Sequence, residues 1–223
     1  MIGQRIQETL RFWSRNIPAL LLVTLPFALT SELIQGVLGP ALHAGEEGIR
    51  VNELSAVLIL LLRPFAEGAI MAQMVGIYLG QTRSLGECLM FSLKAAPVLL
   101  VTYLVLGLGV YVGLLLFIFP GAWLYARLCQ APYIAVLENR TPLQALRTSF
   151  ERTRADQWQI LGAVALVFMI VIALFQLSAL LFTGLFGEQV IGSVGLAITT
   201  SLISCLLNII VFRYFCLMSP QSQ

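Results

Sequence analysis

The chain alternates between long apolar runs and short stretches that carry most of its charged residues. Six apolar runs each approach or exceed the length of about 20 residues that a helix needs to cross a bilayer. They cover residues 17–38, 54–79, 97–119, 121–137, 160–186 and 190–218. This pattern predicts an all-α integral membrane protein with six transmembrane helices.

The separation of the third run from the fourth depends on one short sequence. Phe119, Pro120 and Gly121 are typical of a tight, helix-breaking turn. If this turn were only a kink, the two runs would form one helix of about 40 residues, nearly 60 Å long. Two spans are therefore expected, and 121–137 is the shortest of the six.

The basic residues between the runs predict the orientation of the chain. The connections on one side hold nearly all of them: Arg5, Arg11, Arg15, Arg83, Lys94, Arg140, Arg147, Arg152 and Arg154, and Arg213 approaches the C-terminus on the same side. The opposite connections hold Arg50, beside the acidic residues Glu46, Glu47 and Glu53, and then Glu188. Because basic residues favour the cytoplasmic side, both termini are expected in the cytoplasm.

Two of the cytoplasmic connections have similar sequences. Residues 84–94 align without gaps with residues 141–151. Each segment begins with a capping box, Ser84 with Glu87 and Thr141 with Gln144, so a short helix is expected to begin at each.

The connections also have the apolar and polar faces of helices that lie in a membrane interface. The apolar faces are Leu143, Leu146 and Phe150 in one segment and Ile6, Leu10, Trp13 and Ile17 in the N-terminal segment. The expected architecture is three hairpins, each preceded by a cytoplasmic amphipathic interfacial helix, in one membrane domain divided at 1–80, 81–138 and 139–223. The alternative is that basic, partly amphipathic inner loops are common to all multi-span proteins. Whether these helices lie on lipid or pack under the bundle stays open.

Composition excludes a soluble domain, because 59% of the 223 residues are hydrophobic and only 11% are charged. Six spans leave too little chain for a soluble catalytic domain of ordinary size. The single histidine, His43, provides little for a zinc site or a catalytic triad, and no nucleotide-binding or protease motif is present. We expect no enzymatic activity, no cofactor and no nucleic-acid partner.

Few ionisable residues lie inside the expected spans. Arg63 and Glu67 are four residues apart on one helical face of the second span, and Arg127 lies in the fourth, followed by Gln130. Glu67 and Arg127 lie at similar depth, which predicts an ion pair between them with Arg63 directed outward. This pair is either a proton relay or polar ligand site, or a structural clamp between two hairpins.

The remaining candidates concern lipid contact and helix packing. Basic residues spread over three connections favour anionic lipids, and the candidate lipid-interface residues are Arg5, Arg11, Arg15, Arg147 and Arg154. Interface anchors are expected at Trp123, Tyr125, Trp158, Tyr214 and Phe215. Gly109 and Gly113 have the spacing of a helix-packing motif. A stripe of small and polar residues in 190–218 indicates either packing or a water-lined path.

One segment matches a known pattern. Residues 132–138 read PYIAVLE, residues 142–154 read PLQALRTSFERTR, and Trp158 follows. This resembles the signature of a family of bacterial six-span proteins that includes the YciC-type inner-membrane proteins and the membrane domain fused to some glycerophosphodiester phosphodiesterases. Ala155 stands where that family usually has Gly. The resemblance implies a bacterial inner-membrane location and a role in envelope homeostasis, whereas the phosphodiesterase reaction belongs to a separate soluble domain.

Three functions are therefore open. The first is a non-enzymatic inner-membrane protein that interacts with anionic lipids or with other membrane proteins. The second is a small transporter or lipid flippase that uses Glu67 and Arg127 as an intramembrane polar site. The third is an intramembrane enzyme.

Overall fold

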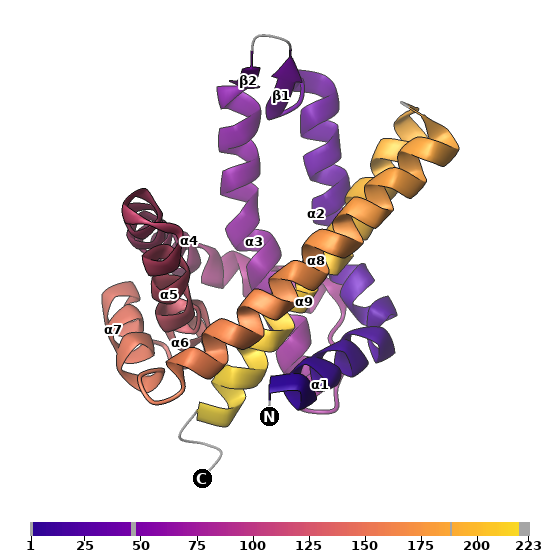
Figure 1. Cartoon of the computed structure of the whole chain (residues 1–223). Coiled ribbons are helices and arrows are strands. Elements are labelled where there is room, and N and C mark those ends of the chain that lie inside the picture. The colour runs from indigo at the N-terminus through magenta and orange to yellow at the C-terminus, as the bar shows by residue number, and fades with distance from the viewer. Residues whose placement is uncertain (1, 46–47, 188, 219–223) are drawn as a thin grey trace. The chain divides into compact units, whose positions relative to one another are not determined.

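The computed structural model describes residues 2–45, 48–187 and 189–218, and nearly all of them are helical. The helices are α1 (Ile2–Arg15), α2 (Ile17–Leu38), α3 (Glu53–Tyr78), α4 (Leu85–Leu116), α5 (Ile118–Leu128), α6 (Ala131–Leu137), α7 (Pro142–Arg152), α8 (Gln157–Phe186) and α9 (Val190–Met218) (Figure 1). The expected all-α class is confirmed. Glu46, Glu47 and Glu188, expected opposite the arginines, lie outside the described residues.

Five of these helices are long and apolar enough to cross a membrane: α2, α3, α4, α8 and α9. They correspond to five of the six apolar runs, and they fit a multi-pass membrane protein. The sixth run, 121–137, is divided between α5 and α6, which are 11 and 7 residues long. The expectation of one crossing helix over 121–137 is therefore corrected.

The break between α4 and α5 lies at Phe117, two residues before the expected turn begins. Phe117 is extended, with φ −166° and ψ 160°, and Pro120 falls in the first turn of α5, where its missing N–H costs no intrahelical bond. The turn brings two glycines together, because a Cβ on Gly113 would lie 2.9 Å from the Cα of Gly121. Gly113 therefore has the packing role expected from its spacing, within this hairpin.

The helices form two compact units. Unit 1 contains Met1–Asn16, Lys94–Ala173 and Ser204–Gln223, and unit 2 contains Ile17–Leu93 and Leu174–Ile203. Each unit is described by itself.

In unit 2, α2 packs against α3, and a small antiparallel hairpin of β1 (Leu42–Gly45) and β2 (Gly48–Val51) joins them. The Asn52 side chain caps this connection, since its amide donates to the Leu38 carbonyl at 2.6 Å and its oxygen accepts from the Ser55 N–H at 3.3 Å. The N-terminal part of α4 packs closely on α3, where a Cβ on Gly68 would lie 3.0 Å from the Cα of Ser92.

In unit 1, α1 is tied to the C-terminal part of α9. Arg213 donates to Glu8 at 2.6 Å, and Thr9 of α1 is fully buried. The core next to them is aromatic: Tyr133 of α6 donates to the Asn208 carbonyl at 3.0 Å and packs on Phe212 and Phe215.

The short polar helices agree with the sequence only in part. Helices α1 and α7 are separate, and both capping boxes are formed, with Ser84 N–H donating to Glu87 at 2.8 Å and Thr141 N–H donating to Gln144 at 3.4 Å. No separate helix exists over 84–94, because α4 continues without a break to Leu116 and accommodates Pro97 inside it.

Each short helix both packs on unit 1 and exposes apolar side chains. In α7 the buried residues are Ala145, Leu146 and Ser149, whereas Leu143 is 71% exposed. In α1 Thr9 is buried and Leu10 is exposed. Helices α1 and α7 therefore each have one buried face and one exposed face, so they both pack on unit 1 and face outward.

Candidate functional site: the Arg127 cluster and the adjoining aromatic pocket

Arg127 lies in the last turn of α5 and is only 3% exposed. Its Nη1 donates to the Gln157 side-chain oxygen at 3.2 Å, and its Nη2 donates to the backbone carbonyl of Phe150. One guanidinium thus joins α5 to the end of α7 and to the first residue of α8.

Two aromatic rings contact the same guanidinium. Its central carbon lies 3.9 Å from the centre of the Phe150 ring and 5.7 Å from the centre of the Trp123 ring. Both distances are within the range of cation–π attraction, which strengthens when the cation is removed from water. Trp123 also donates from Nε1 to Gln157 at 3.1 Å, so Gln157 accepts from two donors.

The backbone of Arg127 is held as firmly as its side chain. Its carbonyl oxygen accepts from Ser149 Oγ at 2.9 Å and from Thr153 Oγ1 at 3.1 Å, and both hydroxyls are buried. Carbonyls in the last turn of a helix lack an intrahelical donor, so these two hydroxyls of α7 satisfy the end of α5.

The positive charge of this cluster is not balanced by an acid within unit 1. Among the residues that the structure describes there, no carboxylate forms an ion pair with Arg127, and its Nε is buried without a hydrogen-bond partner. Removing a charged group from water costs on the order of several kcal/mol unless the charge is paired. The cluster therefore holds a buried positive charge that is incompletely hydrogen-bonded.

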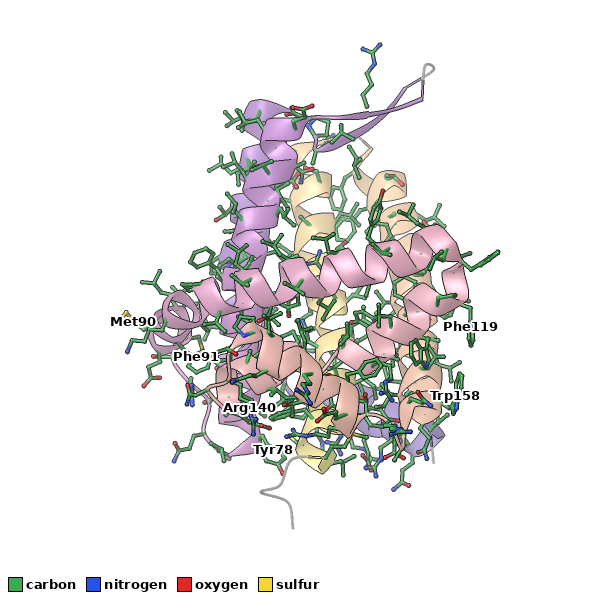
Figure 2. The ribbon with its side chains drawn as sticks, turned by 90° about the vertical axis from the view of Figure 1, so that its left-hand side faces the viewer. Tyr78, Met90, Phe91, Phe119, Arg140 and Trp158 are labelled. Carbon is green, nitrogen blue, oxygen red and sulfur yellow. The ribbon has the colours of Figure 1, made fainter. Side chains whose placement is uncertain are left out.

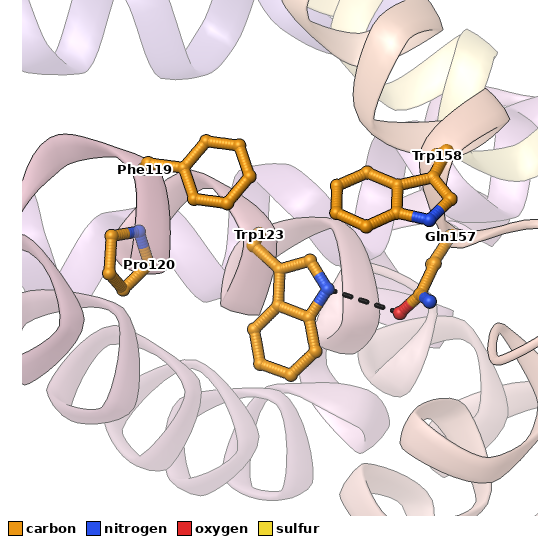
Figure 3. A pocket seen from close by; sticks show the side chains of 5 residues that line it. All are labelled: Phe119, Pro120, Trp123, Gln157 and Trp158. Atoms are coloured by element: carbon orange, nitrogen blue, oxygen red, sulfur yellow. Dashed lines mark hydrogen bonds between the residues drawn. The ribbon is translucent and has the colours of Figure 1, made fainter.

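A pocket of about 340 Å³ adjoins the cluster. Its lining residues come from the start of α5 and the start of α8: Phe119, Pro120, Trp123, Gln157 and Trp158 (Figure 3). Trp123 and Gln157 belong to both features, because they line the pocket and also contact Arg127.

Two exposed aromatic rings form the rim of this pocket. Phe119 and Trp158 stack with their centres 6.1 Å apart, and they are 61% and 58% exposed (Figure 2). Trp158 is thus exposed at the start of an apolar helix, as expected for an interface anchor. The same expectation is wrong for Tyr214 and Phe215, which are buried.

The other ionisable residues of the expected polar site lie in unit 2. Arg63 and Glu67 of α3 form an ion pair at 3.8 Å, with Arg63 73% exposed and Glu67 15% exposed. Arg63 is directed outward, as expected. Glu67 and Arg127 belong to different units, and each is described by the contacts of its own unit, so the pair between them stays a prediction.

Gln130 follows Arg127 by three residues in the sequence and is buried, but its side chain contacts a different helix. Its Nε2 lies 3.2 Å from the sulfur of Met218 at the end of α9, and its Oε1 is buried without a hydrogen bond among the described residues. The structure therefore does not bring Gln130 and Arg127 to a common partner.

The candidate lipid-interface arginines lie on α1 and on α7 or just after it. Arg11, Arg15 and Arg154 are exposed. Arg5 pairs with Glu8 at 3.3 Å, and Arg147 pairs with Glu151 at 2.9 Å on an exposed helix face. The exposed Arg147–Glu151 pair contributes little to stability and leaves both groups accessible, whereas Glu8 of the half-buried pair also binds Arg213.

Sequence analysis missed Gln157 and Phe119 as parts of the site. Gln157 has no signal of its own, whereas Phe119 stands at the edge of an apolar run where aromatic residues often mark an interface. Among the residues that the structure describes, no group of three or more His, Cys, Asp or Glu side chains is placed to hold a metal ion.

Comparison of the chain with protein-family models, with curated proteins and with solved structures finds no match.

Proposed function

We propose that this chain is a non-enzymatic multi-pass protein of a bacterial inner membrane whose cytoplasmic helices α1 and α7 bind anionic lipid head groups. The resemblance of residues 132–158 to the YciC-type proteins supports the bacterial location. The arginine distribution supports cytoplasmic termini. Other membrane proteins are further possible partners of the same surface.

The observation that carries this proposal is the position of α7. Arg127 fixes the end of α7 to Gln157, where the apolar helix α8 begins. If α8 crosses the membrane, α7 lies at the level where hydrocarbon gives way to water. There the exposed Leu143 contacts the apolar layer, and Arg147, four residues on along the same helix face, extends its long side chain to the phosphates, with the exposed Arg154 just after the helix.

The contacts of Arg127 favour a structural clamp over a relay. A proton relay needs a group that exchanges protons, whereas Arg127 is a guanidinium held by two hydrogen bonds and two aromatic rings. The clamp interpretation fits a lipid-binding protein, because it keeps the amphipathic helix in place.

The test is lipid retention by the purified protein, measured by native mass spectrometry after exchange into nanodiscs of phosphatidylcholine with a fraction of phosphatidylglycerol. We expect enrichment of phosphatidylglycerol on the wild type. Replacing Arg11, Arg15, Arg147 and Arg154 by Gln should reduce it, because each basic residue near an anionic surface contributes about 1 kcal/mol.

The matched control removes charge elsewhere. Arg50→Gln changes an exposed arginine on the side expected to lie opposite the cytoplasm, and Arg63→Gln changes an exposed arginine within an expected span. Both variants should leave the phosphatidylglycerol enrichment unchanged. Equal retention of both lipids by the wild type would refute the proposed function.

A further inference from the structure

We propose that the pocket between the starts of α5 and α8 is a specific site for one anionic phospholipid. Its phosphate lies at the Gln157 end, and one acyl chain lies over Phe119 and Trp158. The inference deepens the proposed function, on which it rests, by assigning a single built site within unit 1.

The first argument is unsatisfied positive charge. Arg127 is almost fully buried, has a buried Nε without a hydrogen-bond partner, and is paired with no carboxylate among the described residues of unit 1. Arg154, which is exposed, follows Thr153, whose hydroxyl contacts the Arg127 carbonyl, so a second cation is adjacent to this cluster along the chain. Neither arginine lines the pocket itself, so their charge favours an anion at the Gln157 end through the field around Arg127 rather than by direct contact.

The second argument is the supply of hydrogen-bond donors. The oxygen of Gln157 accepts from Trp123 and Arg127, which leaves its Nε2 to donate. Within the described part of unit 1, neither this amide nor the indole N–H of Trp158 makes a hydrogen bond. Phosphate oxygens accept such bonds readily, whereas the neighbouring rings offer no competing acceptor.

The third argument is the shape and chemistry of the rest of the pocket. Apart from Gln157, every lining residue is aromatic or proline. A volume of about 340 Å³ is near the lower end of ligand pockets, so it holds part of a lipid rather than a whole one. The exposed rim at the start of an apolar helix leaves the remaining acyl chain free to continue into the bilayer.

Tryptophan fluorescence provides a direct test, because Trp123 and Trp158 line the pocket. In a Trp13→Phe background, phosphatidylglycerol with brominated acyl chains is titrated into protein held in phosphatidylcholine nanodiscs. We expect saturable quenching that unlabelled phosphatidylglycerol reverses. Brominated phosphatidylcholine should quench only weakly, and inorganic phosphate should not compete.

Two variants locate the binding. Gln157→Glu keeps the oxygen that accepts from Trp123 and Arg127, but it removes the amide donor and adds a negative charge. The affinity for phosphatidylglycerol should therefore fall about tenfold or more. The melting temperature should not fall, because the contacts with Trp123 and Arg127 remain. Phe119→Ala removes one ring of the rim and should weaken binding several-fold. Phe117→Ala, two residues away, 78% exposed and outside the pocket lining, is the matched control and should bind as the wild type does.

The outcomes separate this site from the proposed function. One outcome is that nanodisc retention shows phosphatidylglycerol enrichment, but brominated phosphatidylglycerol quenches the fluorescence of Gln157→Glu and Phe119→Ala as strongly as that of Phe117→Ala. The pocket assignment is then wrong and the lipid-binding function stands. If retention shows no enrichment while quenching is saturable and sensitive to Gln157→Glu, the pocket stands and the broader function is wrong. Equal quenching by both brominated lipids overturns the site.

Discussion

At the scale of single residues, the end of α5 depends on two hydroxyls of α7. Ser149 donates to the carbonyl oxygen of Arg127 at 2.9 Å, and Thr153 shares its one hydroxyl hydrogen between that oxygen, at 3.1 Å, and the Ser149 carbonyl, at 2.8 Å. Loss of one hydroxyl leaves this buried carbonyl with a partner, whereas loss of both leaves it with none. Leaving a buried acceptor unsatisfied is more costly than losing one of two hydrogen bonds.

We therefore predict a non-additive effect on the free energy of unfolding. Ser149→Ala and Thr153→Val should each cost about 1 kcal/mol or less, and the double variant about 2–4 kcal/mol. Denaturation in detergent, monitored by tryptophan fluorescence, measures all three. Thr148→Val on the same helix is the control and should change little. Strictly additive costs would show that the two hydroxyls do not share this role.

A second residue-scale prediction concerns the pH dependence of α1. The hydrogen bond from Arg213 is the main reason why the pKa of the Glu8 carboxyl lies below its ordinary value of 4.5. A carboxyl whose pKa is lower in the folded state stabilises that state above its unfolded pKa, and the contribution disappears as the pH falls through the lowered value. The docking of α1 should therefore weaken below about pH 4.5 and be unaffected near neutral pH.

Hydrogen exchange of the α1 amides between pH 7 and pH 3, corrected for the intrinsic rate, measures this weakening. Glu8→Gln and Arg213→Gln should each weaken α1 at neutral pH and remove the acid-dependent loss of protection. The double variant should behave like either single one. Wild-type protection that stays constant through the acid range would contradict the assigned role of the pair.

At the scale of elements, the α4–α5 hairpin depends more on Gly113 than on Gly109, the other glycine of the same spacing motif. A Cβ on Gly113 would lie 2.9 Å from the Cα of Gly121, which is too close for the backbone to tolerate without a shift. A Cβ on Gly109 would meet only a Leu124 methyl at 3.5 Å, an ordinary contact.

We predict that Gly113→Ala lowers the melting temperature while Gly109→Ala does not. The cost for Gly113 should be about 1–3 kcal/mol, as for other overpacked sites, whereas Ala at 109 gains helix propensity. Thermal melting followed by size-exclusion chromatography compares the two. A similar loss for both would indicate that the glycine spacing serves a different partner.

The elements also show which parts of the sequence are informative. Local signals were sufficient where the structure depends on neighbouring residues, as at the capping boxes of Ser84 and Thr141. They failed at the end of the helix that begins after Ser84, because α4 continues through Pro97, the breaker that stands at the start of the following apolar run. The partners of Arg127 were not predictable, since its hydrogen bonds join residues 23 and 30 positions away.

At the scale of the whole molecule, the contacts of unit 1 restrict how often the chain crosses the membrane. The bond between Glu8 and Arg213 joins α1 to the C-terminal part of α9, so we expect these two elements, and with them both ends of the chain, on one side of a membrane. A chain with both ends on one side crosses an even number of times. Five helices are candidates, so they cannot all cross unless 118–137 crosses as well.

The contacts of α5 argue against a crossing by 118–137. Phe119 at the start of α5 stacks on Trp158, and Arg127 near its end binds Gln157, so both ends of α5 lie at the start of α8. A crossing segment would separate its ends. We therefore expect four crossings, with α4 entering and leaving on the same side, because its C-terminal end is joined directly to α5.

Labelling of single cysteines in intact cells tests this topology, after replacement of Cys88, Cys129, Cys205 and Cys216. Ser14→Cys, Ser84→Cys and Phe117→Cys should all be protected from a membrane-impermeant maleimide added outside, whereas Arg50→Cys should react. All four positions are exposed in the folded chain, so protection reports the membrane rather than burial. Reaction at 117 with protection at 84 would show that α4 crosses, and 118–137 would then have to return the chain as a sixth, broken span.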